Sequence, residues 1–232
     1  MLSDLFAADV KLTPYWWDRT PRPVLPASEL PQAVDVVVIG SGYTGLSTAL
    51  VTARGGRKTL VLDAEDAGWG CSTRNGGQIS TSIKPGYEEL ARRHGAETAF
   101  RIVKDGQHSL AWIGEFVAQE RIDCDFQVVG RFHAAHGPRH YEALAERLRN
   151  QPKGLEIAAH LVPRAMQHEE LGTAAYCGGV VYERHASVDP ARLQQGMLER
   201  VLSTGSDIVT NCRATRIRPN GKGFLVETVR CG

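Results

Sequence analysis

Three glycines after a short apolar run have the spacing of a nucleotide-binding turn. Residues 36–39 read Val-Val-Val-Ile, and Gly40, Gly42 and Gly45 follow within Gly-Ser-Gly-Tyr-Thr-Gly. The first glycine of such a motif permits a tight turn off a strand, the second lets the backbone approach a pyrophosphate, and the third lets the next helix lie close to the strand. Free N–H groups and the positive end of that helix are suited to bind the phosphates.

A carboxylate stands where a ribose-binding acid is expected. Asp63 closes a second apolar run, residues 59–62, and its carboxylate can accept hydrogen bonds from ribose hydroxyls. The pattern predicts a strand at 36–39, a helix that ends at Gly55-Gly56, and a strand at 59–62. The alternative is an ordinary α/β unit with glycine-rich turns, because 24 glycines in 232 residues produce loose matches by chance.

The residues after the second strand bear on which dinucleotide is bound. Asp63, Glu65 and Asp66 make an acidic neighbourhood that disfavours the 2′-phosphate of NADP and leaves FAD and NAD. Residues 68–78 read Gly-Trp-Gly-Cys-Ser-Thr-Arg-Asn-Gly-Gly-Gln, whereas an NAD domain normally continues with another plain βα repeat. Such a loop can approach a bulky ligand and present a guanidinium to it. One alternative is a surface loop built from turn residues. Another is that Arg74 pairs with a carboxylate of the fold instead of contacting the cofactor.

Three segments, in this order, resemble motifs of the FAD-dependent D-amino acid oxidase/glycine oxidase superfamily. They are Gly40–Gly45, Asp63-Ala64 and residues 68–77. They are most similar to its γ-glutamylputrescine oxidase-like branch. Tyr15-Trp16-Trp17, residues 122–126 and residues 211–217 also resemble that branch, so the resemblance runs from about Tyr15 to the end of the chain. One departure is Asp63, where the family more often has glutamate; either carboxylate can serve the ribose.

The resemblance implies a fold, a cofactor and a reaction. The expected fold is α/β: a Rossmann-like FAD-binding domain with part of an α+β substrate domain, the C-terminal half of such an enzyme being absent. The implied reaction oxidises the C–N bond of an amine or amino acid by hydride transfer to flavin, with oxygen as acceptor and peroxide as product. Two alternatives stay open: a non-catalytic, truncated dinucleotide-binding fragment, and an NAD-dependent dehydrogenase domain.

From these patterns we predict a set of cofactor-binding residues. The resemblance implies a main-chain contact from Ala214 to the adenine side of FAD, and we assign no catalytic residue. The predicted set is Gly40, Gly42, Tyr43, Thr44, Gly45, Asp63, Gly70, Ser72, Arg74, Asn75, Gln78 and Ala214.

Composition and charge disfavour two classes of partner. The formal net charge is +1 with both signs interspersed, which favours neither nucleic acid nor a membrane surface as partner. Five scattered cysteines without a CxxC pair, and no signal-peptide pattern, predict a cytoplasmic protein. His133, His136 and His140 do not predict a metal site, because residues three apart on a strand face opposite sides. The oligomeric state is left open.

The remaining patterns predict how the chain is organised. We expect an extended arm over residues 1–32, an FAD-binding domain over 33–122 and 185–232, and a partial substrate domain over 123–184. Residues 87–120 predict two helices divided at Gly106. Residues 126–134 predict a strand, and residues 138–149 a helix. Asp189-Pro190 predicts a helix start, residues 208–209 a strand of the nucleotide sheet, and residues 214–217 and 224–227 a hairpin.

Overall fold

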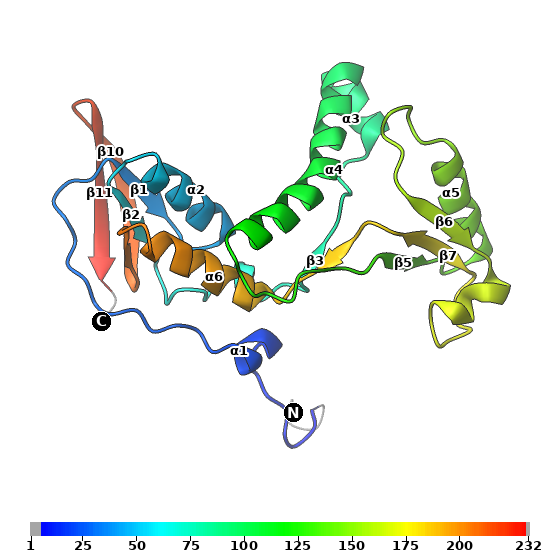
Figure 1. The fold of residues 1–232 in the computed structure, drawn as a ribbon, viewed down its shortest axis with the longest axis horizontal. Helices are drawn as coiled ribbons and strands as arrows, with labels where there is room; N and C mark the ends of the chain where they lie inside the picture. Colours follow the sequence, from blue (N-terminus) through cyan, green and yellow to red (C-terminus); the bar gives the residue numbers. More distant parts are fainter. Residues whose placement is uncertain (1–5, 231–232) are drawn as a thin grey trace. The chain divides into compact units, whose positions relative to one another are not determined.

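The computed structural model describes residues 6–230, which form two compact units (Figure 1). The first unit contains the described residues up to Gly76, then Glu120–Cys124, and the described residues from Asp189 onward. The second unit contains Gly77–Gln119 and Asp125–Val188. Each unit has its own sheets and its own hydrophobic contacts.

A three-stranded parallel sheet forms the centre of the first unit. Its strands are β1 (Val36–Ile39), β2 (Thr59–Leu62) and β9 (Asp207–Val209), in the order β1-β2-β9. The middle strand β2 is buried at all four residues, as a strand covered on both faces requires. Helix α2 (Tyr43–Arg54) connects β1 to β2, and α6 (Pro190–Leu202) precedes β9.

The two faces of this sheet are covered by different elements. Alternate residues of a strand point to opposite faces, and Thr59 hydrogen-bonds through its hydroxyl to Thr52 of α2 at 3.0 Å. Leu60 and Leu62 instead pack with Val209, Cys212 and Val226, which places the hairpin of β10 (Cys212–Asn220) and β11 (Gly223–Arg230) on the other face. In Figure 1 the hairpin and α2 accordingly stand on opposite sides of β1 and β2.

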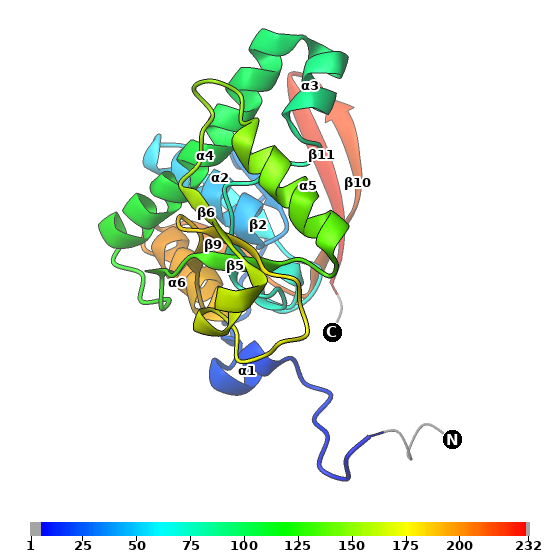
Figure 2. The same cartoon turned by 90° about the vertical axis from the view of Figure 1, so that its right-hand side faces the viewer.

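The second unit is built from two antiparallel sheets and three helices. Its elements are β3 (Gln78–Ile79), α3 (Tyr87–His94), α4 (Ala96–Gln119), β4 (Gln127–Val128), β5 (Arg131–Ala134), α5 (Pro138–Arg149), β6 (Ala159–Val162), η3 (Arg164–Glu169), β7 (Gly179–Tyr182) and β8 (Ala186–Ser187). One sheet has the order β3-β8-β4 and the other the order β5-β7-β6. Leu144 of α5 packs with Val180 of β7 and with Ala135, which follows β5, and Figure 2 shows α5 lying across the second sheet.

Several local predictions are confirmed. The strands at 36–39 and 59–62 have the predicted bounds, and β9 pairs in parallel with β2. The Asp189 carboxylate caps α6 by accepting hydrogen bonds from the N–H groups of Ala191 and Arg192 at 3.0 and 3.1 Å. The predicted helix at 138–149 and the predicted hairpin are also present.

Three local predictions were wrong. The helical segment divides at Gly95, whose φ of 83° ends α3, and α4 runs unbroken through Gly106. A Cβ at position 106 would lie 2.5 Å from Ile83 Cγ1, so this glycine serves close packing within a helix. The predicted strand at 126–134 is two strands, β4 and β5, separated at Gly130 with φ of 70°. The arm, whose residues 1–5 lie outside the described residues, includes a short helix, α1 (Tyr15–Arg19).

The compact units do not follow the predicted domain ranges. Residues 77–119 were assigned to the cofactor domain, but they group with the second unit, where β3 pairs with β8. The C-terminal boundary also differs slightly, because the first unit resumes at Asp189. Which functional domain each segment serves stays a prediction. Within the described part of the chain, no helix combines the length and apolar character needed to cross a membrane.

Replacing Gly45 by alanine tests the close packing of α2 on β1. A Cβ there would lie 1.9 Å from the Gly40 carbonyl oxygen and 3.3 Å from Val38 Cγ1. Because backbone must move, we expect a loss of roughly 3 kcal/mol in the free energy of unfolding, at the upper end of overpacking costs. Urea denaturation measures it, and Val51→Ala on the exposed side of the same helix is the control. An unchanged midpoint for Gly45→Ala would contradict this packing.

A second prediction concerns the pair between Arg54, the last residue of α2, and Glu120. The guanidinium donates two hydrogen bonds to the carboxylate, at 2.6 and 2.8 Å, and it lowers the pKa of Glu120 below its ordinary value. A carboxylate whose pKa is lower in the folded chain contributes stability above the unfolded pKa of about 4.3, and that stability is lost as pH falls through the folded value.

We therefore expect Glu120→Gln to lower the free energy of unfolding at pH 7 by about 0.5–1 kcal/mol. The difference from the wild type should shrink below roughly pH 4, where the wild-type carboxylate is protonated as well. Urea denaturation across this pH range measures the effect. Glu97→Gln, in the far more exposed pair with Arg101, is the control and should change little. A constant difference at every pH would argue against an ionic origin.

Candidate cofactor site

The glycine-rich segment forms a tight turn between β1 and α2. Gly40 has a φ of 97°, a left-handed conformation that favours glycine. Its N–H donates to the Leu62 carbonyl at 2.7 Å, so the turn begins against the end of β2. Gly45 faces the Gly40 carbonyl so closely that a Cβ would not fit. The two glycines therefore have the geometry predicted for the first and third positions of the motif.

The first turn of α2 presents main-chain N–H groups beside this turn. Gly42 caps the helix, and the first intrahelical acceptor is its carbonyl, which accepts from Leu46 N–H at 2.9 Å. The N–H groups of Tyr43, Thr44 and Gly45 therefore precede the helical ladder, as at any helix start. Ser72 Oγ accepts from Tyr43 N–H at 3.1 Å. Such a helix terminus is suited to bind an anion.

Asp63 lies at the end of β2 and points toward the glycine-rich turn. Its Oδ2 accepts from the N–H and the hydroxyl of Ser41, at 2.7 and 2.5 Å. Its Oδ1 accepts from Glu65 N–H at 3.0 Å. A carboxylate offers about four lone-pair sites, so about one acceptor site remains, on Oδ1. Asp63 is half-buried beside the turn. Its carboxylate can accept one further hydrogen bond.

The loop after β2 folds over the start of α2. It contains the 3₁₀ turn η2 (Cys71–Thr73). The buried Thr73 hydroxyl contacts the carbonyls of Gly68 and Gly70 at 2.5 and 3.3 Å. The Asn75 amide donates to the carbonyls of Cys71 and Ser72 at 3.1 and 3.0 Å. These bonds give the loop a defined shape.

Helix α6 holds the turn from a third side. The Gln194 amide, almost fully buried, donates to the Ser41 carbonyl at 3.0 Å. The Tyr43 hydroxyl donates to the Pro190 carbonyl at 2.9 Å. Burial raises the pKa of the Tyr43 phenol well above its ordinary value, although hydrogen bonding to Asn75 works in the opposite direction. The phenol is therefore neutral at physiological pH and serves as a donor.

The other predicted site residues on the first unit make fewer contacts that bear on cofactor binding. Thr44 is exposed on the first turn of α2, and Gly70 caps η2. The exposed Arg74 lies over the Trp69 ring at 4.4 Å and donates to the Gly70 carbonyl at 3.4 Å, so the structure does not show the alternative in which it pairs with a carboxylate. Ala214 lies on β10, two residues after Cys212, whose N–H donates to the Asp63 carbonyl at 2.8 Å.

Gln78 is the predicted residue that lies outside the first unit, so its role at this site stays a prediction. It lies on β3 of the second unit, paired with Ser187 of β8. The sequence grouped it with residues 68–77 because it follows them directly. The division between the two units falls between Gly76 and Gly77.

Four residues of the site are absent from the predicted set. Ser41 bonds to Asp63 through both its N–H and its hydroxyl, and Gln194 holds the Ser41 carbonyl. Gln194 had a readable signal, because it stands at helical spacing with the buried residues Met197 and Val201. Trp16 and Trp17 had no local signal for their contacts, since their indoles bond to residues of the loop more than fifty positions away.

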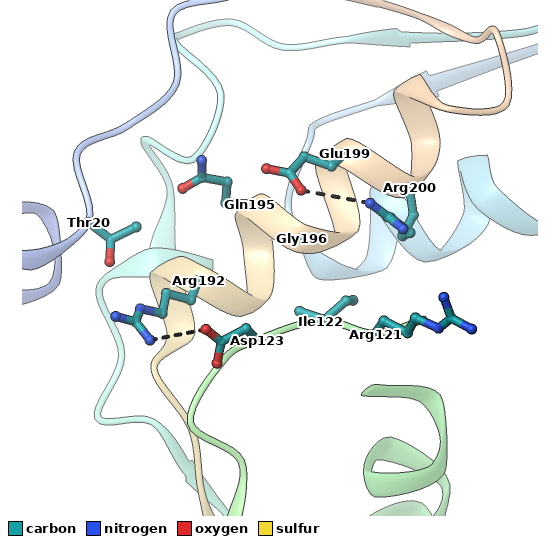
Figure 3. Close-up of a pocket in the computed structure, with 9 residues that line it drawn as sticks. All are labelled: Thr20, Arg121, Ile122, Asp123, Arg192, Gln195, Gly196, Glu199 and Arg200. Atoms are coloured by element: carbon teal, nitrogen blue, oxygen red, sulfur yellow. Dashed lines mark ion pairs between the residues drawn. The ribbon is translucent and has the colours of Figure 1, made fainter. Parts of the chain in front are cut away.

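A pocket of about 330 Å³ on the first unit lies elsewhere. It runs along α6 and residues 121–123, as Figure 3 shows. Its charged groups form loose pairs, with Arg192 3.8 Å from Asp123 and Arg200 3.9 Å from Glu199. None of the predicted cofactor-binding residues lines it. The glycine-rich turn therefore remains the better candidate for the cofactor.

The histidines of the second unit also come together, though not as a metal centre. The His133 and His136 rings lie 5.7 and 6.0 Å from the His140 ring. The strand ends at Ala134, so His136 is not on the strand as the alternation argument assumed. Among residues 6–230, no group of three or more His, Cys, Asp or Glu side chains is arranged to hold a metal ion.

Comparisons with solved structures agree with the fold. Glycine oxidase from Geobacillus kaustophilus superposes with a TM-score of 0.71 at 16% identity, covering 84% of this chain and 51% of that one. L-amino acid deaminase from Proteus vulgaris gives a TM-score of 0.69 at 21% identity, covering 91% of this chain and 54% of that one. At these identities the likeness concerns the fold.

Curated relatives match most of the chain. A protein named probable oxidoreductase OrdL, from Rhizobium meliloti, is 27% identical over 92% of this chain and 50% of its own length. Gamma-glutamylputrescine oxidoreductase of Escherichia coli is 28% identical over 79% of this chain and 43% of its own length. The chain thus spans about half the length of the curated relatives it matches. The family model for FAD dependent oxidoreductases of the DAO type matches residues 35–232, and the chain belongs to this family.

Proposed function

We propose that this chain holds the adenosine diphosphate part of FAD at the turn between β1 and α2. The observation that carries the proposal is the meeting of three features at one end of a parallel sheet. These are the left-handed turn at Gly40, the N-terminus of α2 at Gly42, and the Asp63 carboxylate at the end of the adjacent strand. Dinucleotides bind outside the carboxyl ends of such strands, with the pyrophosphate at the helix N-terminus.

The residues present fit the cofactor. The pyrophosphate would be held by the N–H groups at the start of α2, around Thr44 and Gly45, where the helix dipole favours negative charge. A ribose hydroxyl would donate to the remaining acceptor site on Asp63 Oδ1. Ser72, Arg74 and Asn75 would contact the cofactor from the loop, and Ala214 would contact its adenine side through the main chain. Gln78 is retained in the proposed set, although it lies on the second unit.

The proposed activity of the whole protein is oxidation of a C–N bond in an amine or amino acid. FAD, when bound, supplies the acceptor for the hydride, and this chain orients it and surrounds its phosphates with donors. Oxygen as the final acceptor, with peroxide as product, belongs to the same proposal. The name of the Escherichia coli relative supports an amine as substrate, and membership in the DAO family supports the flavin.

A second arrangement is a fragment that binds the dinucleotide without catalysing a reaction. It is favoured by one observation, namely that the chain spans about half the length of its relatives. Both arrangements share the cofactor site. Peroxide release with amines separates them, because only the catalytic arrangement produces it.

Flavin binding is the first test of this proposal. Purified chain incubated with FAD and passed through a desalting column should retain the flavin absorbance band. NAD at the same concentration should not raise the melting temperature. A colourless chain that NAD stabilises would instead support a dehydrogenase domain, and a chain that neither dinucleotide affects would contradict the site.

Gly42→Val tests where the pyrophosphate lies. A Cβ at this position would meet Ser72 Oγ at 3.0 Å and would stand where the phosphates are expected to approach. We expect flavin retention to be lost while the melting temperature of the FAD-free chain changes little. Gly86→Val is the matched control, since Gly86 caps α3 with a similar φ of −71° and open space at its Cβ position. Full retention by Gly42→Val would contradict the placement.

A further inference from the structure

The short helix α1 contacts the loop that follows β2, although more than fifty residues separate them. Trp17 Nε1 donates to Thr73 Oγ1 at 2.8 Å. Trp16 Nε1 donates to the Asn75 carbonyl oxygen at 2.8 Å. Consecutive indoles thus bond to two positions of one loop, and both contacts lie within the first unit.

The Trp17 bond completes the hydrogen bonding of a buried hydroxyl. Thr73 is 2% exposed, and its hydroxyl proton is directed to the carbonyls of Gly68 and Gly70. A hydroxyl has one proton to donate and two lone pairs to accept with. The indole of Trp17 fills an acceptor position that water reaches poorly. Removing the indole would leave a buried polar atom less well satisfied, which disfavours this loop conformation.

Stacked cations extend the same contact. The Arg22 guanidinium lies 4.4 Å from the centre of the Trp17 ring and pairs with Asp66 at 3.1 Å. The Arg74 guanidinium lies 4.4 Å from the Trp69 ring and 5.7 Å from the Trp17 ring. Arm and loop therefore alternate aromatic rings with guanidinium groups, an attractive arrangement in itself.

The opposite side of the loop contacts the proposed phosphate site. Ser72, next to Thr73, accepts the hydrogen bond from Tyr43 N–H at the start of α2. The Cβ position of Gly42 is 3.0 Å from the same Ser72 oxygen. The loop is thus held between α1 and the first turn of α2, so a shift on the arm side moves the groups beside the phosphates.

We propose that α1 is a clamp that sets the cofactor loop in its binding conformation, with Trp17 and Trp16 as positioning residues for FAD. This inference rests on the proposed function, because it assumes that the site takes FAD. Neither indole needs to touch the cofactor. Both act through Thr73 and Asn75, and the arm contributes to affinity by ordering the loop before the ligand arrives.

The test uses Trp17→Phe in the full 232-residue chain and two measurements. Loss of one hydrogen bond corresponds to a change of about 3- to 10-fold. We expect the dissociation constant for FAD, measured by flavin fluorescence, to rise by that factor. Without FAD, amide hydrogen exchange in residues 70–76 should become faster, while exchange in α6 stays as in the wild type. The second readout does not require cofactor.

Matched variants separate this role from general packing. Trp112→Phe removes an indole from α4, where the ring stacks on Phe116 at 5.2 Å, and should leave both readouts unchanged. Thr73→Val removes the acceptor of the Trp17 bond and also the bonds from the hydroxyl to the carbonyls of Gly68 and Gly70, so it should weaken FAD binding and accelerate exchange at least as much as Trp17→Phe. The double variant should then lose little more than Thr73→Val alone, because the Trp17 bond is already absent from that variant. Trp16→Phe should accelerate exchange around Asn75.

The outcomes distinguish the two proposals. Wild-type chain that binds no FAD overturns the proposed function and this inference with it. Wild-type chain that binds FAD, together with Trp17→Phe of equal affinity and equal exchange, overturns the clamp alone. Faster exchange with unchanged affinity also overturns it, since the arm would then order the loop without serving the cofactor. Circular dichroism on each variant checks that the fold is retained.

Discussion

The contact between α2 and β1 is the constraint on which the site depends. The backbone at Gly45 lies so close to the Gly40 carbonyl oxygen that a Cβ would stand 1.9 Å from it. This approach sets the helix start directly beyond the end of the sheet, with its first N–H groups beside the turn. A wider spacing would move those N–H groups away from Asp63, and the proposed anion site and the proposed ribose acceptor would no longer adjoin.

Ser41 turns this packing into a connected polar network. Its N–H and hydroxyl bond to Asp63 of β2, and its carbonyl accepts from Gln194 of α6. One nearly fully buried residue therefore links three elements that are distant in the sequence. The short aspartate side chain is held against the turn by these bonds. A glutamate is longer by one methylene group and would extend further from β2, so aspartate favours the compact arrangement with one acceptor site left over.

Short-range patterns in the sequence were enough to predict the sheet and the turn. Residues 36–39 and 59–62 are continuous apolar runs, Asp189-Pro190 is a helix cap followed by a proline, and Asn220-Gly221 lies between two alternating segments. Each signal acts within a few residues, so local propensity decides the outcome. The spacing of Gly40, Gly42 and Gly45 is equally local, and it predicted the tight turn between the first strand and the helix.

Predictions failed where distant contacts decide. Gly106 stays inside α4 because Ile83 occupies the space beside it, and nothing near Gly106 in the sequence indicates that neighbour. The bonds from Ser41 to Asp63 and from Trp17 to Thr73 likewise join residues 22 and 56 positions apart.

The family match includes the glycine-rich turn but not α1 of the arm. The family match begins at residue 35 and therefore contains the turn, Asp63 and the loop, whereas α1 precedes it. The glycine spacing is sufficient to place the proposed phosphate site, because helix N–H groups need no side chain, and the acid adds the proposed ribose acceptor. The loop is different, since a stretch rich in glycine and small residues has high conformational entropy to lose. Two indoles from outside the matched segment bond to this loop, so its order in this protein depends on residues beyond those that define the cofactor turn.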